Sequence, residues 1–251
     1  MKSKRVKAML WIGAFKTEAT MAESLEQSLQ ETLRASFKSY VRSDHHPCIM
    51  AKAAERFDRI TLKRYRRMGC EQTTQALYSD IEAYAAKIQT AQASSSRSLR
   101  FESFVAVFDQ SRFGSERKFE DLLWRQLEML HEYDDVPWDP SVSQDPDCPD
   151  FSFSIAGFAF FIVGLHPDSC RKARRFFRPA IVFNLHYQFQ DLKTAGKFET
   201  IQRKIRRLDK VHNGSFNPVL ADYGQASEAL QYSGREVEKN WKCPVKFGSS
   251  S

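Results

Sequence analysis

Hydrophobic residues recur every four positions across residues 17–41. They are Met21, Leu25, Leu29, Leu33 and Phe37. This spacing puts them on one side of the chain and predicts an amphipathic helix. The same periodicity predicts three more helices, over 71–92, 115–131 and 197–211. The last of these is strongly basic, with Phe198, Ile201, Ile205 and Leu208 expected to face inward.

Three stretches have the shorter period of β-strands. FESFVAVFD (101–109) alternates apolar with polar or small residues and predicts a strand. Residues 151–164 begin with such an alternation and continue as an apolar run, which predicts one buried strand entered from an exposed edge. AIVFNLH (180–186) is its expected partner, joined to it by a wide loop or a turn of helix.

Loops separate these elements at 94–98 (SSSRS) and at 134–150, where four prolines and six aspartates gather. The predicted fold is therefore α/β (α+β), a single domain with a central, mostly antiparallel or mixed sheet and flanking helices. With 42% hydrophobic residues and 20 phenylalanines, the chain has ample material for a packed core, which argues against disorder.

The formal charge of +7 and the pI near 9.1 favour anionic partners but do not choose among them. A solvated basic face is the alternative reading of the same surplus. The five cysteines are scattered without C-x-x-C spacing, which argues against a zinc cluster and is typical of reduced thiols in the cytoplasm. The short apolar run near the N-terminus is a poor secretory signal, and no stretch reaches a membrane span. We therefore expect a cytoplasmic protein without membrane contacts.

Two of the six histidines end predicted strands: His166 in VGLHP and His186 in FNLHYQF. Rigid strand ends are common positions for functional groups, and a neutral imidazole there can ligate iron. Taken alone, either residue is more often a hydrogen-bonded core histidine than a ligand.

Between the two histidines lies a basic cluster: Arg171, Lys172, Arg174, Arg175 and Arg178. Arginine pairs well with carboxylates at the edge of a cofactor, such as the propionates of haem. The same cluster could instead bind a nucleic-acid phosphate or face solvent. Further on, 217–237 is dense in polar groups. If it is helical, Glu228 and Tyr232 share a face, where a carboxylate suits a cationic guanidine or amine. A structural hydrogen-bond network is the competing interpretation.

Several phrases together resemble one family, the YqcI/YcgG family. The phrases are HPCIMAKAA (46–54), FSFSIAGFAFFIVGLHPDSCRKARRF (151–176), VFNLHYQFQDL (182–192), NPVLADYGQASEALQYSGRE (217–236) and WKCPVKFG (241–248). Family members carry FPC and CPF motifs. Here His46 and Val245 replace the two phenylalanines, while the neighbouring Pro-Cys and Cys-Pro pairs remain. The resemblance predicts a domain over 36–248, an N-terminal, partly helical extension over 1–35 and a flexible tail over 249–251.

This resemblance implies a haem-dependent N-oxygenase (a monooxygenase-type oxidoreductase) that oxidises nitrogen on a guanidine, an amine or an amino-heterocycle. The expected cofactor is haem b, with O₂ or peroxide as oxidant. His166 is the expected iron ligand, with His186 as the rival or as a distal group. Arg171, Arg174 and Arg175 are expected around the cofactor, and Glu228 and Tyr232 at the substrate. Cys48 and Cys243 are thiolate alternatives, for which a structural role is favoured.

The expected partners are a small nitrogenous substrate, an electron-donor protein and a second copy of the chain in a homodimer. Two other functions stay open at this point. One is a non-haem iron oxygenase that uses His166, His186 and either Asp191 or Glu228 as a facial triad. The other is a basic nucleic-acid-binding regulator, which the charge favours although no recognition motif supports it.

Overall fold

The computed structural model describes residues 2–94, 100–215 and 226–248, with side chains from Met21 onward except those of Ala22 and Ser94. The chain divides into two compact units, Met1–Ser39 and Tyr40–Ser251. The first is formed by most of the helix α1 (Lys2–Arg42). Three members of its predicted apolar stripe, Met21, Leu25 and Leu29, are exposed. The predicted division at residues 35 and 36 stays a prediction, and the expected tail lies outside the described residues.

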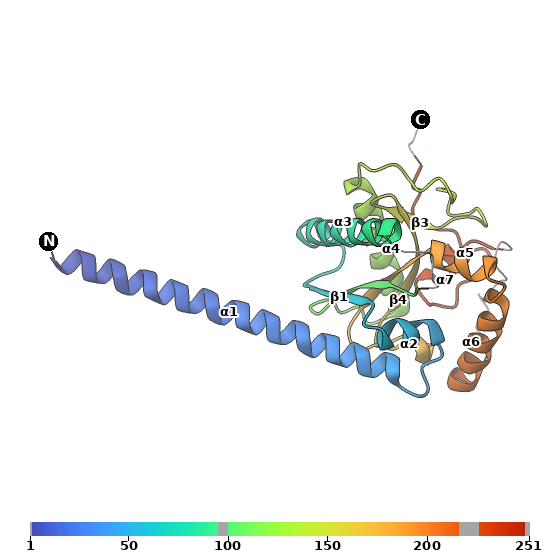
Figure 1. Cartoon of the computed structure of the whole chain (residues 1–251), viewed down its shortest axis with the longest axis horizontal. Coiled ribbons are helices and arrows are strands. Elements are labelled where there is room, and N and C mark those ends of the chain that lie inside the picture. Colours follow the sequence, from blue (N-terminus) through green and yellow to red (C-terminus); the bar gives the residue numbers. More distant parts are fainter. Residues whose placement is uncertain (1, 95–99, 216–225, 249–251) are drawn as a thin grey trace. The chain divides into compact units, whose positions relative to one another are not determined.

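The second unit is built on one five-stranded sheet with the order β1-β2-β5-β4-β3 (Figure 1). The strands are β1 (Ile60–Tyr65), β2 (Ser103–Phe108), β3 (Phe153–Ile155), β4 (Phe158–Leu165) and β5 (Ala180–Leu185). β1 and β2 run parallel, and all other neighbours run antiparallel. The predicted α/β class with a mixed, mostly antiparallel sheet is confirmed, and so is the pairing of β4 with β5.

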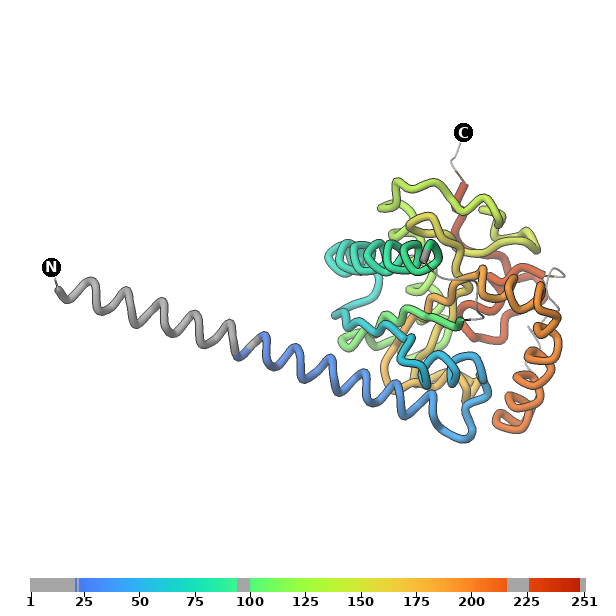
Figure 2. The backbone as a smooth tube through the Cα atoms, in the orientation of Figure 1, coloured from blue at the N-terminus to red at the C-terminus, as the bar shows by residue number. Residues whose placement is uncertain are grey.

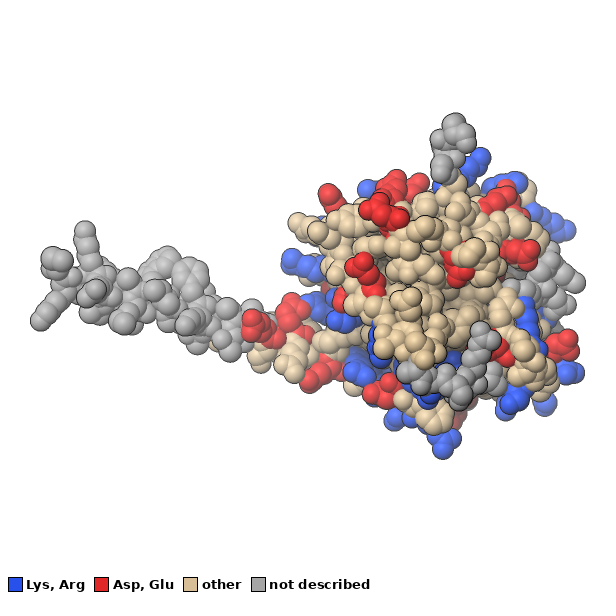
Figure 3. Space-filling view, turned by 45° about the horizontal axis from the view of Figure 1, so that its top comes forward, with Lys and Arg blue, Asp and Glu red and all other residues tan. Residues whose placement is uncertain are grey.

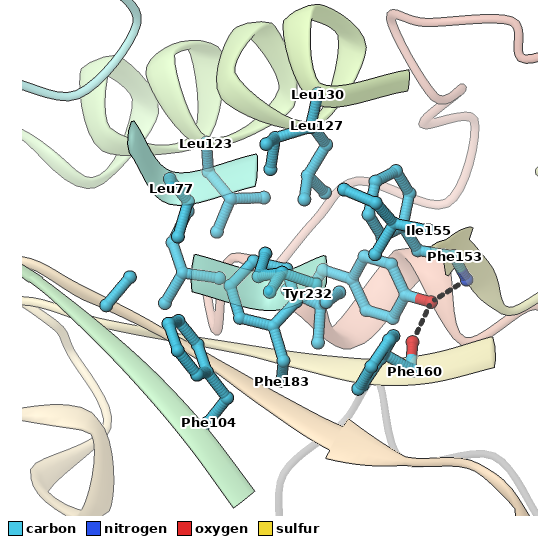
Figure 4. Packing of buried hydrophobic residues seen from close by; sticks show 14 of the residues in the cluster. Leu77, Phe104, Leu123, Leu127, Leu130, Phe153, Ile155, Phe160, Phe183 and Tyr232 are labelled. Atoms are coloured by element: carbon cyan, nitrogen blue, oxygen red, sulfur yellow. Dashed lines mark hydrogen bonds between the residues drawn. The ribbon is translucent and has the colours of Figure 1, made fainter. Parts of the chain in front are cut away.

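The helices of this unit are α2 (Ile49–Arg56), α3 (Glu71–Ser94), α4 (Glu116–Tyr133), α5 (Tyr187–Thr194), α6 (Phe198–Asn213) and α7 (Ala229–Tyr232), with a 3₁₀ turn at Lys172–Arg174. α3 and α4 pack against each other, and together with the sheet they enclose the hydrophobic core (Figures 1 and 4). A parallel pair of strands needs a crossover connection, which α3 provides between β1 and β2. The predicted helices over 71–92, 115–131 and 197–211 are confirmed.

One strand prediction needs correction. The single strand expected over 151–164 is a hairpin, because Ala156 and Gly157 both adopt positive φ (51° and 76°) and turn the chain between β3 and β4. The strand predicted over 101–109 is confirmed as β2, and all six of its residues are buried, since it lies between β1 and β5. β1, α2 and α5 were not predicted from the sequence.

The carboxyl end of β5 leads directly into two consecutive helices, which Figure 2 traces in orange as α5 and α6. α6 contains no fully buried residue: Phe198, Ile201, Ile205 and Leu208 are half buried and Val211 is exposed. Among the described residues, no helix combines the length and the apolar character that crossing a membrane requires.

Candidate functional site

His186 follows the last residue of β5 and occupies the N-cap position of α5. Its backbone N–H donates to the carbonyl of Ala159 at 2.8 Å, which holds His186 beside the first residues of β4. The side chain is buried, and this burial lowers the pKa of the imidazole to about 4. At neutral pH the ring is therefore uncharged, which is the form that can ligate a metal or exchange a proton.

A buried carboxyl group lies beside this imidazole. Glu228 Oε1 is 3.7 Å from His186 Nδ1, and the glutamate precedes α7 at its N-cap position. Burial raises the pKa of Glu228 to about 8, although the Ser152 hydroxyl, the Lys193 ammonium and the Tyr232 hydroxyl each lower it. Both members of the pair are therefore mostly neutral near pH 7, and the carboxyl group holds a transferable proton.

One face of α5 extends this polar cluster toward the surface. Gln190 Nε2 lies 3.0 Å from His186 Nε2, one turn along the helix. Lys193 follows after nearly another turn, with its ammonium 5.4 Å from the centre of the Phe198 ring. Positions i, i+4 and i+7 of a helix share a face, so the local geometry of α5 aligns the three side chains. The charge of Lys193 also contributes to the lowered pKa of His186.

Lys193 belongs to a cleft of about 730 Å³ between α5 and α6. The other lining residues are Gly196, Phe198, Glu199, Gln202, Arg203 and Arg206. Three of the seven lining residues are cationic and one is anionic, so the cleft suits a ligand with negative charge at its edge. Its volume lies within the range of small-molecule and cofactor sites, about 300–1,000 Å³.

His166 lies in a different environment just beyond β4. Its ring is 1% exposed and stacks on Phe119, with 4.3 Å between the ring centres. Burial lowers the pKa of this imidazole as well. Neither ring nitrogen has a hydrogen-bond partner within the described part of the chain. His166 therefore has the unsatisfied nitrogens of a ligand, but one face of its ring is covered by the core.

The two histidines lie at opposite ends of the same pair of strands. β4 and β5 are antiparallel, with Phe160 opposite Leu185 and Leu165 opposite Ala180. About seven residues of β4 separate the two ends, which corresponds to roughly 20 Å. The facial triad that combined His166 with His186 is therefore excluded. Moreover, no group of three or more His, Cys, Asp or Glu side chains suited to a metal ion occurs among the described residues.

The three arginines expected around a cofactor bind oxygen atoms of the protein itself. Arg171 forms an ion pair with Asp209 on α6 and donates to Ser215. Arg174 donates to backbone carbonyls, among them that of Gly164 at 3.1 Å. Arg175 donates to the carbonyl of Ser169 at 2.6 Å. These bonds hold the β4–β5 connection to α6 and α7, so all three guanidinium groups have structural roles here.

Tyr232 is fully buried in the core. Its hydroxyl accepts a hydrogen bond from the Phe153 N–H at 3.0 Å and donates to the Phe160 carbonyl at 3.4 Å, so it ties α7 to both strands of the hairpin (Figure 4). Glu228 is the N-cap residue of α7 and lies four positions before Tyr232, which puts the two residues on one face of this helix. The part of that segment over 217–225 lies outside the described residues.

The two cysteines considered as thiolate ligands have raised pKa values. Burial raises the pKa of Cys48, whose sulfur caps α2 by accepting from the Ala51 N–H at 3.4 Å. Burial likewise raises the pKa of Cys243 to about 12. Both thiols therefore stay protonated, which agrees with the structural role favoured for them.

Sequence reasoning overlooked Gln190, Lys193 and Ser152. The first two carry a signal that was available, because they follow His186 at helical spacing. Ser152, whose hydroxyl contributes to the pKa of Glu228, carries no such signal, since it lies more than seventy positions away in the sequence.

Comparison with known proteins extends over most of the chain. Residues 37–246 match the sequence profile of the YqcI/YcgG family. The chain is also 26% identical over 240 residues to the uncharacterised protein YcgG of Bacillus subtilis (strain 168), a match that covers 90% of this chain and 92% of that protein. No solved structure gives a significant match. Because the profile covers well over half of its length, this chain belongs to the YqcI/YcgG family.

Proposed function

We propose that this chain is a haem-dependent N-oxygenase whose cofactor binds at the His186–Glu228 pair. The observation that carries the proposal is a buried, neutral imidazole beside a buried carboxyl group, on the helix face that leads into a cationic cleft. The family resemblance supports haem as the group to be held. Bound haem would supply the iron at which O₂ or peroxide is activated for transfer of oxygen to nitrogen.

The residues of the cluster divide the remaining tasks. His186 would hold the iron through Nε2, which Gln190 Nε2 contacts at 3.0 Å and would have to release, and Glu228 would orient the ring from the side of Nδ1, as carboxylates commonly do for metal-bound histidines. The present 3.7 Å exceeds a hydrogen bond, so this contact would have to shorten on binding. Lys193, Arg203 and Arg206 would supply positive charge for the two carboxylates of haem. Glu228, whose pKa is about 8, carries a proton near pH 7 that it could donate.

His186 is preferred to His166 as the ligand for two reasons. His166 stacks on Phe119, so one face of its ring is closed. The cleft that lies beside α5, the helix that His186 begins, is lined by three cationic side chains. This choice reverses the assignment expected from the sequence.

Titration with haem tests the proposal. Protein purified without cofactor should develop a Soret band on addition of haem, and the band of the reduced protein should shift with CO to a position typical of histidine ligation. His186→Ala should lose this uptake, while His166→Ala should keep it, with circular dichroism showing that both variants fold. Failure of the wild-type protein to bind haem rejects the proposal. If only His166→Ala loses haem uptake, His166 and not His186 is the iron ligand.

Substrate class is tested with the loaded protein. Guanidines, amines and amino-heterocycles are incubated with a reductant and O₂, and the products are examined by mass spectrometry for one added oxygen on nitrogen. Nucleic-acid binding with steep salt dependence would instead favour a regulator. On the face drawn in Figure 3, however, basic and acidic side chains are intermingled around an uncharged centre, which gives little support to a nucleic-acid surface there.

A further inference from the structure

The helix α1 has an exposed apolar stripe. Met21, Leu25 and Leu29 are 69%, 62% and 39% exposed. They follow one another every four positions, so they lie within about 80° around the helix axis. Most of α1 forms a compact unit by itself, Met1–Ser39, and a single helix has no core in which to bury such a stripe. Because an amphipathic helix gains most of its stability from packing of its apolar face, the exposed stripe is a candidate interaction surface.

The charges along α1 are divided into blocks of opposite sign. Residues 1–16 contain five basic residues and no acidic one, whereas residues 17–31 contain four glutamates and no basic residue. Beyond this acidic block the apolar positions Leu33 and Phe37 are already buried. The part of the helix that is left for a partner is therefore 2–31, of which one half is basic and the other acidic.

We propose that residues 2–31 of α1 pair antiparallel with the same residues of a second copy of this chain. In that alignment the basic block of each copy lies opposite the acidic block of the other, and the attraction occurs twice in the dimer. A pair centred between residues 17 and 18 also brings residues 21–29, which contain the exposed stripe, opposite residues 6–14 of the second copy. Seven of the nine residues in 6–14 are hydrophobic. The paired length is about 45 Å.

A parallel pair of the same helices would be disfavoured. It would align the basic blocks with each other and the acidic blocks with each other, and like charges on neighbouring helix faces repel. The order of charges along the sequence therefore selects the antiparallel arrangement.

An anionic membrane is the competing surface for a helix with a basic N-terminal block. The exposed stripe, however, lies within the acidic block, together with Glu23, Glu26 and Glu31. Anionic headgroups repel these carboxylates, whereas the basic block of a second copy attracts them. The charge along the stripe thus favours a second copy over a lipid surface.

Sedimentation equilibrium of the full chain tests the pairing without any cofactor. The protein should form a dimer of twice 29.0 kDa that dissociates on dilution. Leu25→Glu puts a carboxylate within the stripe and should raise the dissociation constant by about 100-fold or more. The matched control Gln27→Glu adds the same charge to an exposed position about 200° around the helix from Leu25, and should change the constant by no more than about threefold. Leucine, glutamine and glutamate have similar helix propensities, so both variants should keep the helical circular dichroism of the wild type.

The dependence on salt distinguishes the two orientations. Sodium chloride screens the attraction between opposite blocks, so raising it from about 0.05 M to 0.5 M should weaken an antiparallel dimer, whereas it would strengthen a parallel one. A wild-type monomer at submillimolar concentration overturns the proposal, and so does a dimer that salt strengthens or that Leu25→Glu leaves intact. If the monomer instead sediments with vesicles of phosphatidylcholine and phosphatidylserine, the stripe binds lipid. None of these outcomes depends on haem, because α1 contains no residue of the proposed cofactor site.

Discussion

The backbone amide of His186 hydrogen-bonds to the carbonyl of Ala159, which puts His186 at the far end of the β4–β5 pair from His166. In the sequence each histidine follows the last residue of a strand. Because β4 and β5 run antiparallel, these two strand ends lie at opposite ends of the pair. They therefore belong to two sites. Only His186 has a buried carboxyl group at its ring and lies on the helix face that leads into a cleft.

Glu228→Gln should stabilise the protein in alkaline solution. The folded-state pKa of Glu228 is about 8, above its ordinary value of 4.5, so ionisation costs more in the folded than in the unfolded chain. The free energy of unfolding of the wild type should consequently fall as pH rises from about 4.5 to 8. Relative to the wild type, the glutamine variant should gain on the order of 4 kcal/mol at pH 9 and little at pH 4. Urea unfolding at several pH values measures this, and a constant difference would contradict it.

His186→Gln should make the free energy of unfolding less sensitive to acid. The folded-state pKa of His186 is about 4, below its ordinary 6.5, so the folded state resists protonation of the ring. This contribution to stability is complete above pH 6.5 and is lost as pH falls toward 4, by about 3 kcal/mol. The free energy of unfolding of the variant should therefore vary less between pH 6.5 and 4. His45→Gln, which replaces an exposed histidine, is the matched control for the loss of an imidazole.

Gly164→Ala should be strongly destabilising. A β-carbon at this position would lie 2.7 Å from Phe119 Cε1, 2.8 Å from Leu123 Cδ1 and 2.9 Å from the Tyr232 carbonyl oxygen. Because one of these atoms is backbone, relief requires a shift of α7, and we expect a loss of about 2–3 kcal/mol. Thermal unfolding gives the measurement. Gly248→Ala, where a β-carbon meets nothing within 4 Å, is the control and should be neutral.

Arg171→Met should loosen α6. The ion pair of Arg171 with Asp209 is buried and is one of the few contacts that hold this helix, which has no buried residue of its own. Breaking one partner leaves a buried charge, so we expect a loss of about 3 kcal/mol and faster amide hydrogen exchange in α6. If haem binding failed while exchange in α6 stayed slow, Arg171 would instead belong to the cofactor site.

Local patterns were sufficient for much of this fold. The helical periods at 71–92, 115–131 and 197–211 each mark a helix that the structure contains, because a one-sided apolar stripe determines both the helix and the face it buries. The apolar run at 180–186 likewise marks β5. The division of 151–164 was missed because a two-residue turn at Ala156 and Gly157 hardly interrupts an apolar pattern.

The sequence alone determined the mixed α/β class, the pairing of β4 with β5 and the two histidines that end these strands, since each depends on side-chain pattern over a few neighbouring residues. Tertiary structure alone decided which histidine has a carboxyl neighbour and that the arginines bind protein oxygens. It also decided that Trp124 stacks on Tyr232 more than a hundred positions away. Such contacts depend on strand order and helix docking, which join distant segments and leave no periodic trace in the chain.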